Sequence, residues 1–179
     1  KKSFFGFDFY VDENVLIPRP ETEELVQWVI DDNDTSDKKK LIDLGAGSGC
    51  IGISISKTIN LDVTLADKSK EALRVCNINK DILESDVKII EYDLNTEFTM
   101  NQFFDIIISN PPYLDYYSRE EIDENVNFEP HIALFAPKDD PLYFYKQILI
   151  FGDKNLNKGG QIYLEINPTF IKEFKSLLT

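Results

Sequence analysis

Apolar and polar residues follow two different periods along this chain, and the two periods alternate. Short continuous apolar runs, typical of strands buried on both faces, are separated by segments whose apolar residues recur at helical spacing. This β–α alternation predicts an α/β protein with a doubly wound, mostly parallel sheet. The expected strands are 41–44, 63–66, 87–92, 104–109 and 161–166, and the expected helices are 50–59, 69–83, 142–156 and 170–178.

The first forty residues carry a different pattern. Apolar and polar residues alternate over 5–11, which predicts a half-buried strand, and residues 15–17 are expected to return as its hairpin partner. A helix with Trp28 on its apolar face follows, and the polar stretch 31–39 is expected to be a linker or loop. We therefore expect residues 1–39 to form a short β-hairpin and a helix that lead into the main domain, 40–179.

Length, charge and cysteine content narrow the class of protein. A chain of 179 residues suits one domain, and Lys+Arg 19 against Asp+Glu 32 gives a formal net charge of −13. No Lys/Arg cluster of the kind that follows phosphates is present, so no nucleic-acid partner is expected. No apolar run reaches the length of a membrane span, and Cys50 and Cys76 lack metal-site spacing. We expect a cytoplasmic monomer with reduced thiols, no metal and no membrane contact.

The tetrapeptide Asn110-Pro111-Pro112-Tyr113 directly follows the apolar run 104–109. Two prolines cannot continue a central strand, so the chain must leave the sheet at its carboxyl edge, where ligands of open α/β sheets bind. There Asn110 Oδ1 and the Pro111 carbonyl can accept hydrogen bonds from both N–H groups of an NH2 group, and Tyr113 can lie against the plane of that group. For this motif alone, a strand-ending turn without a ligand remains the alternative.

A second candidate site is the loop Gly45-Ala46-Gly47-Ser48-Gly49, between the first strand and its helix. Glycines let the backbone turn tightly and approach a ligand, and the following helix presents free N–H groups. Asp67 ends the second strand, where a carboxylate can accept both hydroxyls of a ribose. Asp93 and Leu94 follow the third strand, where they can bond an adenine amino group and pack on its ring.

Two cofactors are compatible with this loop. Gly47, Gly49 and Gly52 spell G-x-G-x-x-G, the dinucleotide fingerprint. The longer series from Asp43 and Gly45, Asp-Leu-Gly-x-Gly-x-Gly, resembles the first motif of S-adenosylmethionine (SAM) methyltransferases. Asp43 suits the amino-acid end of such a cofactor, whereas a carboxylate beside a pyrophosphate would repel it. We favour SAM, with S-adenosylhomocysteine as product, over NAD, and a glycine turn without a cofactor is the remaining alternative.

Three segments together resemble one family. They are 16–23 (Leu-Ile-Pro-Arg-Pro-Glu-Thr-Glu), 110–113, and 127–134 with its Asn-Phe-Glu-Pro and Ala-Leu. Over nearly its whole length the chain is similar to the HemK/PrmC type of release-factor glutamine methyltransferase. The Pro-Arg-Pro-Glu segment is the specific part, because Asn-Pro-Pro-Tyr also occurs in DNA adenine and ribosomal RNA guanine methyltransferases.

The resemblance implies SAM-dependent methylation of the glutamine side-chain amide in the Gly-Gly-Gln loop of a peptide chain release factor. By position, residues 45–49 would hold the methionine end of SAM, Asp67 the ribose, and residues 93–94 the adenine. Residues 110–113 would hold the glutamine, and Thr22 would close over the cofactor.

The sequence also departs from the family. Ala46 stands where many relatives have Thr, and Leu94 replaces an aromatic residue. The family's N-terminal helical domain is absent and the chain begins at Lys1, so we expect a piece of a longer protein whose SAM-binding catalytic domain is 40–179. The family's last strand pair is absent too, because the chain stops at Thr179.

Besides an NAD-dependent oxidoreductase, two other functions stay open. The first is a nucleic-acid methyltransferase that acts on the exocyclic amine of adenine or guanine, which the net negative charge disfavours. The second is a SAM-binding module without catalysis, which the presence of Asn110 disfavours.

Overall fold

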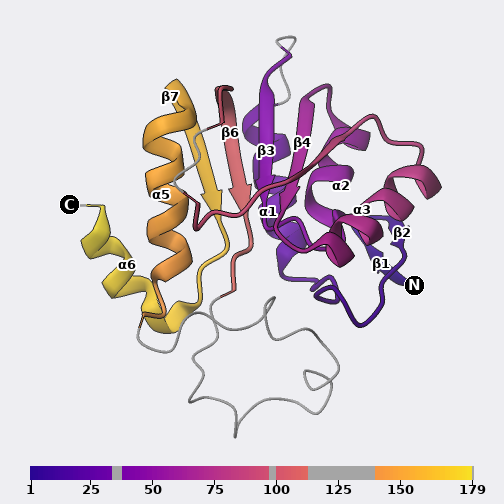
Figure 1. The fold of residues 1–179 in the computed structure, drawn as a ribbon, viewed down its shortest axis with the longest axis horizontal. Coiled ribbons are helices and arrows are strands. Elements are labelled where there is room, and N and C mark those ends of the chain that lie inside the picture. The colour runs from indigo at the N-terminus through magenta and orange to yellow at the C-terminus, as the bar shows by residue number, and fades with distance from the viewer. Residues whose placement is uncertain (34–37, 97–99, 113–139, 179) are drawn as a thin grey trace, which may run out of the picture.

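The computed structural model describes residues 1–33, 38–96, 100–112 and 140–178. Five parallel strands form one sheet, and their carboxyl ends point to the same edge (Figure 1). The prediction of a parallel α/β sheet is thereby confirmed. In sheet order the strands are β5 (Lys88–Glu91), β4 (Asp62–Asp67), β3 (Lys40–Leu44), β6 (Phe104–Ser109) and β7 (Leu156–Leu164).

Helices cover both faces of this sheet, as a doubly wound fold requires. Successive side chains of the central strand β3 point to opposite faces, so that Leu41 packs in one core cluster and Ile42 in the other. Three helices pack in the first cluster: α1 (Thr22–Asn33), α2 (Cys50–Thr58) and α3 (Lys70–Ile82). The second cluster contains α5 (Tyr143–Asn155), against which η3 (Pro168–Phe170) and α6 (Ile171–Leu177) pack.

The N-terminal hairpin exists, but not where the alternation placed it. Its strands are β1 (Lys2–Phe4) and β2 (Phe7–Phe9), which pair antiparallel around a two-residue turn. Phe5 and Gly6 in that turn have φ angles of 48° and 78°, as a type I′ hairpin turn needs. The expected return strand over residues 15–17 is therefore wrong. The apolar alternation runs straight through the turn, so periodicity alone could not locate it.

The first helix is longer than its sequence predicts, and it buries a different face. It continues to Asn33, into the stretch expected to be a linker, because the buried Asn33 Nδ2 bonds the Val29 carbonyl at 3.0 Å and the Tyr163 hydroxyl at 3.2 Å. Trp28, expected on the apolar face, is 57% exposed and meets the Tyr163 ring edge-on. The buried face consists of Leu25, Val26, Val29 and Ile30.

The last strand also begins earlier than expected. Residue 156 was predicted to end a helix and residues 161–166 to form the strand, but β7 spans Leu156–Leu164. Gly159, with φ of 83°, lies inside the strand at an irregularity in its pairing with β6, where the register shifts between Phe104 and Ile106. The glycines thus mark a bulge rather than the end of a helix.

Candidate functional site

The two motifs predicted from the sequence meet where the strand order reverses. The glycine loop follows β3 and Asn110 follows β6, and these two strands are neighbours at the centre of the sheet. Ser109 Oγ donates a hydrogen bond of 2.6 Å to the Leu44 carbonyl and joins the two strand ends. Ligands of open α/β sheets bind outside such a switch point.

A pocket that is partly open to solvent lies at this edge. Its walls combine most of the residues that the sequence singled out, which are Thr22, Gly45, Ala46, Gly47, Ser48, Asp67, Asp93, Leu94, Asn110, Pro111 and Pro112. Asp43 and Gly49 do not line it. Tyr113 lies outside the described residues.

The glycine loop presents backbone rather than side chains to the pocket. Gly45 and Gly47 have φ angles of 72° and 56°, in the left-handed region that glycine tolerates best. A Cβ atom at either position would meet no atom within 4 Å, so both glycines face open space. The Gly45 and Ala46 N–H groups both donate to the Ala66 carbonyl, at 2.8 and 3.1 Å, and fix the loop to the end of β4.

Gly52 and Asp43 support this loop from below. A Cβ atom at Gly52 would lie 2.3 Å from Leu65 Cδ2, so this glycine allows α2 to pack closely on the sheet. Its N–H donates to Asp43 Oδ2 at 3.0 Å, while the buried Asp43 Oδ1 has no hydrogen-bond partner among the described residues. Burial raises the pKa of Asp43 to about 7, although the Gly52 N–H lowers it. Asp43 is therefore a buried acid beneath the loop.

Asp67 stands at the end of β4 with both oxygens held by backbone. Oδ2 accepts the Gly47 N–H and Oδ1 accepts the Ser69 N–H, each at 2.9 Å. Burial raises the pKa of Asp67, whereas these N–H groups lower it. Each carboxylate oxygen can accept a further hydrogen bond, so the fixed carboxylate suits two neighbouring hydroxyl groups, such as those of a ribose.

The wall beyond β5 combines an apolar slot with a carboxylate. Tyr92 and Leu94 pack with the second core cluster and also line the pocket. Asp93 Oδ1 accepts the Asn95 N–H at 2.9 Å, which fixes the turn that holds this carboxylate in place. Flat apolar surface beside a hydrogen-bond acceptor suits a heteroaromatic ring with an amino group.

Asn110 is held by two residues from distant parts of the chain. Its Nδ2 donates to Thr22 Oγ1 at 3.2 Å, and Thr22 Oγ1 donates to Glu165 Oε2 at 2.6 Å. Thr22 begins α1 and is 2% exposed, whereas Glu165 directly follows β7. The sequence reasoning missed Glu165, whose only local signal is its place after the last strand, at the edge that carries the site.

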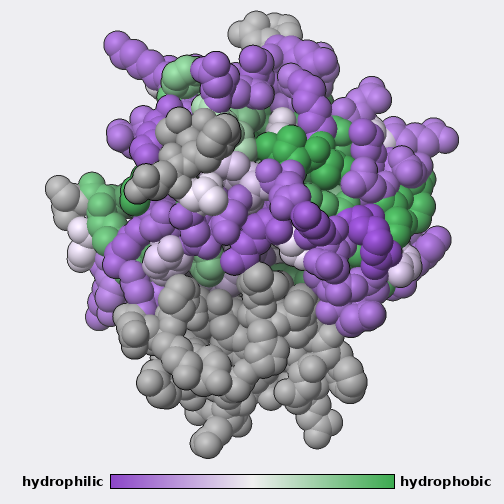
Figure 2. Space-filling view, viewed as in Figure 1, coloured by the Kyte–Doolittle hydropathy of each residue, from purple (hydrophilic) through white to green (hydrophobic). Residues whose placement is uncertain are grey.

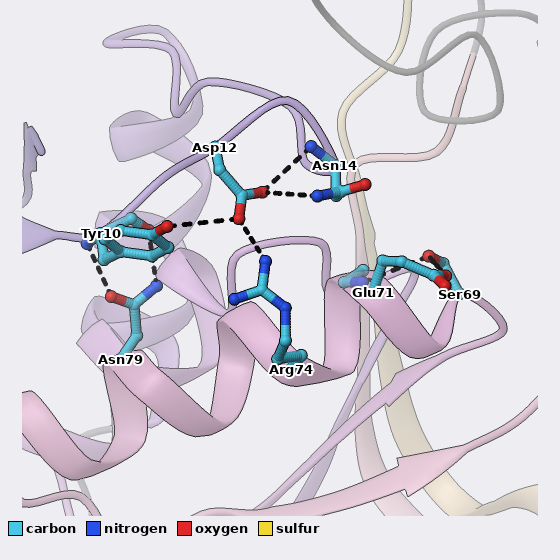
Figure 3. Close-up of polar contacts among 8 residues, drawn as sticks. Tyr10, Asp12, Asn14, Ser69, Glu71, Arg74 and Asn79 are labelled. Carbon is cyan, nitrogen blue, oxygen red and sulfur yellow. Dashed lines mark hydrogen bonds and ion pairs between the residues drawn. The ribbon is translucent and has the colours of Figure 1, made fainter.

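Residues 10–19, which we call the strap, run from the hairpin across α3 to the pocket (Figure 3). The buried Asn79 of α3 holds the strap, because its Oδ1 accepts the Tyr10 N–H at 2.7 Å and its Nδ2 donates to the Tyr10 carbonyl at 2.9 Å. The same Nδ2 donates to the Ser48 carbonyl of the glycine loop at 2.9 Å. One buried amide thus joins the strap, the helix and the loop.

A second contact of the strap is an ion pair. Arg74 of α3 bonds the Asp12 carboxylate, which also accepts the backbone and side-chain N–H groups of Asn14 (Figure 3). Partial burial would raise the pKa of Asp12, but the Asn14 N–H and Arg74 hold it below its usual value. Asn14 lines the pocket, so this contact fixes one pocket wall.

Outside the pocket, the described residues show three further features. Hydrophilic residues cover most of the described surface on the face shown in Figure 2, interrupted by small hydrophobic patches. Among the described residues, no helix is both long and apolar enough to cross a bilayer. The same residues contain no group of three or more histidine, cysteine, aspartate or glutamate side chains that could hold a metal.

Comparison with known families gives one clear match. The family model of the methyltransferase small domain matches residues 22–126. The chain is 46% identical over 180 residues to a release factor glutamine methyltransferase from Flavobacterium psychrophilum, and the match covers 98% of this chain and 63% of the relative. It is 38% identical over 175 residues to a ribosomal protein uL3 glutamine methyltransferase from Francisella tularensis, covering 93% of this chain and 54% of the relative. The resemblance drawn from the motifs is confirmed, and the chain spans less than two thirds of these relatives.

Solved structures agree on the fold. The catalytic domain of hMettl16, crystallised with a hairpin of the MAT2A 3′UTR, superimposes with a TM-score of 0.74 at 19% sequence identity. The superposition covers 97% of this chain and 66% of that one. At this identity the likeness establishes the shared α/β architecture alone.

Proposed function

Because this chain belongs to the methyltransferase small domain family, we propose that it transfers a methyl group from SAM to the side-chain amide nitrogen of a glutamine. The glutamine would be that of the Gly-Gly-Gln loop in a peptide chain release factor. One observation supports this most: the glycine loop and Asn110 follow adjacent strands whose ends are bonded through Ser109 and Leu44. A cofactor on the loop and an amide at Asn110 would therefore be neighbours.

The pocket residues fit SAM better than a dinucleotide. Asp67 offers a fixed carboxylate for the ribose hydroxyls, and the slot beside Asp93 suits adenine. The open backbone of the loop at Gly45 and Gly47 would hold the methionine end. Asp43 lies beneath this loop, where its negative charge, present once the pH exceeds its pKa of about 7, would favour the ammonium group of SAM and oppose a pyrophosphate.

Bound SAM supplies an electrophilic methyl group on a sulfonium sulfur. A primary amide nitrogen is a poor nucleophile, because its lone pair is delocalised into the carbonyl. Asn110 Oδ1 and the Pro111 carbonyl would accept hydrogen bonds from the two N–H groups of the substrate amide. These contacts would fix the nitrogen and direct its lone pair to the methyl group. Such positioning supplies roughly 7–11 kcal/mol of a barrier in favourable cases. The N–C bond would form as the S–CH3 bond breaks, S-adenosylhomocysteine would leave, and the methylated nitrogen would then lose one proton to water, so no base is required before transfer.

Two similarities bear on the substrate. The two relatives described above act, by their names, on a release factor and on ribosomal protein uL3. The higher identity favours the release factor, and uL3 is the second candidate. Either substrate would place the reaction in the cytoplasm, where the protein would act as a monomer.

The test is methyl transfer to a purified release factor, followed by peptide mass spectrometry. With SAM and this protein, the Gly-Gly-Gln peptide should gain one methyl group on its glutamine. Asn110→Ala should lower kcat by about 100-fold or more, the usual cost of removing one fixed polar group from a transition-state site, with little change in the Kd for SAM. The matched control is Asn60→Ala, an exposed asparagine remote from the site.

The outcomes separate the alternatives. Equal losses of SAM affinity and turnover in Asn110→Ala would contradict the role of Asn110. Methylation of uL3 but not of the release factor would favour the second substrate. SAM binding without transfer to either protein, together with methylation of an RNA or DNA amine, would replace the proposal by the nucleic-acid alternative.

A further inference from the structure

The series Glu165–Thr22–Asn110 has a fixed direction of proton donation. A carboxylate has no proton to donate, so the proton between Glu165 Oε2 and Thr22 Oγ1 belongs to the threonine hydroxyl. Their separation of 2.6 Å is typical of a hydroxyl that donates to a charged oxygen. Glu165 therefore determines which way the only hydroxyl proton of Thr22 points.

This direction determines the orientation of the Asn110 amide. Because the proton of Thr22 is directed at Glu165, Thr22 Oγ1 can only accept at its contact with Asn110. Asn110 must turn its NH2 group to Thr22, which leaves Oδ1 on the other side of the amide. Asn110 lines the pocket, and its Oδ1 has no hydrogen-bond partner among the described residues.

We propose that Glu165, acting through Thr22, locks the Asn110 amide with its oxygen toward the pocket and so makes the site select a group that donates hydrogen bonds. This inference rests on the proposed function, since the selected donor is the NH2 group of the substrate glutamine. With the amide reversed, the NH2 group of Asn110 would oppose the NH2 group of the substrate. Glu165 and Thr22 are positioning residues in this scheme.

The backbone around Glu165 is itself held in place. The Glu165 N–H donates to the Ser109 carbonyl at 3.1 Å, and the hydroxyl of the buried Tyr145 donates to the Glu165 carbonyl at 3.1 Å. Glu165 is therefore tied to the end of β6, the strand that carries Asn110. This arrangement sets the carboxylate before any ligand arrives, as preorganisation of a binding group requires.

Substitutions at the two positioning residues test the proposal. Thr22→Val keeps the shape but removes the hydroxyl, and Glu165→Gln introduces an NH2 group that can donate to Thr22 and release its proton to Asn110. Each should lower kcat/KM for methyl transfer by roughly 10–100-fold, the usual effect of removing a residue that orients a ligand-binding group. Thr22→Ser should recover most of the loss seen in Thr22→Val. Thr58→Val, a matched exchange at an exposed position of α2, should leave activity unchanged.

Discrimination between two isosteric peptides gives a readout that a merely structural contact would not change. One peptide carries N5-methylglutamine, which retains one N–H, and the other carries the γ-methyl ester of glutamate, which has none. The unchanged protein should bind the N–H peptide more tightly, and Glu165→Gln should narrow the ratio of the two Kd values severalfold. An unchanged ratio, with both affinities falling together, would overturn the proposal.

A third measurement separates this inference from the proposed activity. The side-chain NH2 signals of Asn110, identified by their absence in Asn110→Ala, should exchange with solvent at least about tenfold more slowly in the unchanged protein than in Thr22→Val. If no glutamine is methylated but this difference is present, the proposed function fails and the orienting contact stands. Equal exchange rates would refute the orienting contact whatever the activity.

Discussion

At the scale of single residues, Asp43 is the most unusual group of the site. It is fully buried, and one carboxylate oxygen lacks a partner among the described residues. An ionised carboxylate in such a place is costly, and the group instead keeps its proton up to a pH of about 7. Asp43, which supports the glycine loop, is thus an acid whose charge changes with pH near neutrality.

The first prediction concerns stability against pH. The pKa of Asp43 rises from 3.8 in the unfolded chain to about 7 in the folded one, so folding takes up a proton between these values. The contribution of Asp43 to the free energy of unfolding should therefore fall as pH rises from 4 to 7, by up to about 4 kcal/mol, and stay constant above that range. The measurement is urea unfolding from pH 4 to 8 for the unchanged protein and Asp43→Asn.

The difference in the free energy of unfolding between these two proteins isolates the contribution of Asp43, since all other titrating groups are present in both. Relative to the unchanged protein, Asp43→Asn should gain stability over the window from pH 4 to 7. Asp62→Asn, which removes a half-exposed carboxylate at the opposite end of the sheet, serves as the matched control. A pH-independent difference for Asp43→Asn would mean that Asp43 titrates alike in both states.

At the scale of the element, the Asn79 side chain holds the strap together with the Arg74–Asp12 ion pair and the packing of Val15 on α3. Asn79 makes three hydrogen bonds, and its truncation would leave the buried Ser48 carbonyl and two partly buried backbone groups of Tyr10 without these partners. Each such group costs about 1–3 kcal/mol, and local rearrangement recovers part of that cost. The strap should therefore detach before the sheet unfolds.

We predict that Asn79→Ala lowers the free energy of unfolding by roughly 2–4 kcal/mol and weakens SAM binding more than the loss of global stability explains. Amide hydrogen exchange should rise across the strap and little in β3 or β6. Asn77→Ala is a matched control on the exposed side of the same helix. Equal protection of the strap in both variants would show that its contacts with the rest of the molecule hold it without Asn79.

The elements that sequence predicts best are those whose limits have a local cause. β6 ends where two prolines follow it, and α3 begins after Ser69, whose hydroxyl accepts the Ala72 N–H. The hairpin strands, by contrast, were misplaced because alternation continues through Phe5 and Gly6. The local sequence pattern shows whether an element is a helix or a strand, but it only sometimes shows where that element begins and ends.

The residues of the site also differ in how well the sequence predicts them. The glycine loop and Asn110 were found because glycines and prolines have strong backbone requirements that follow directly from sequence. Glu165 and Asn79 were missed because their roles depend on partners 143 and 69 residues away. A buried polar residue acquires such a role only when the fold brings its partner to it.

At the scale of the whole molecule, the pocket joins segments from both halves of the sheet, so an occupant should stabilise the entire fold. A ligand at 100 times its Kd adds about 2.7 kcal/mol to the free energy of unfolding. For a chain of this size, that corresponds to a rise in Tm of about 5–10 °C. We predict this rise with S-adenosylhomocysteine and none with NAD at equal concentration, measured by differential scanning fluorimetry. A larger rise with NAD would reverse the choice of cofactor.

The strap also has a consequence for how the protein is made. Its residues leave the ribosome before every strand of the parallel sheet, yet Asn79, which holds Tyr10, is synthesised 69 residues later. During that interval the strap has been synthesised, but α3, on which it packs, has not. Cofactor can therefore be retained only after α3 has emerged and folded back, so the strap takes its place later than its position in the chain would suggest.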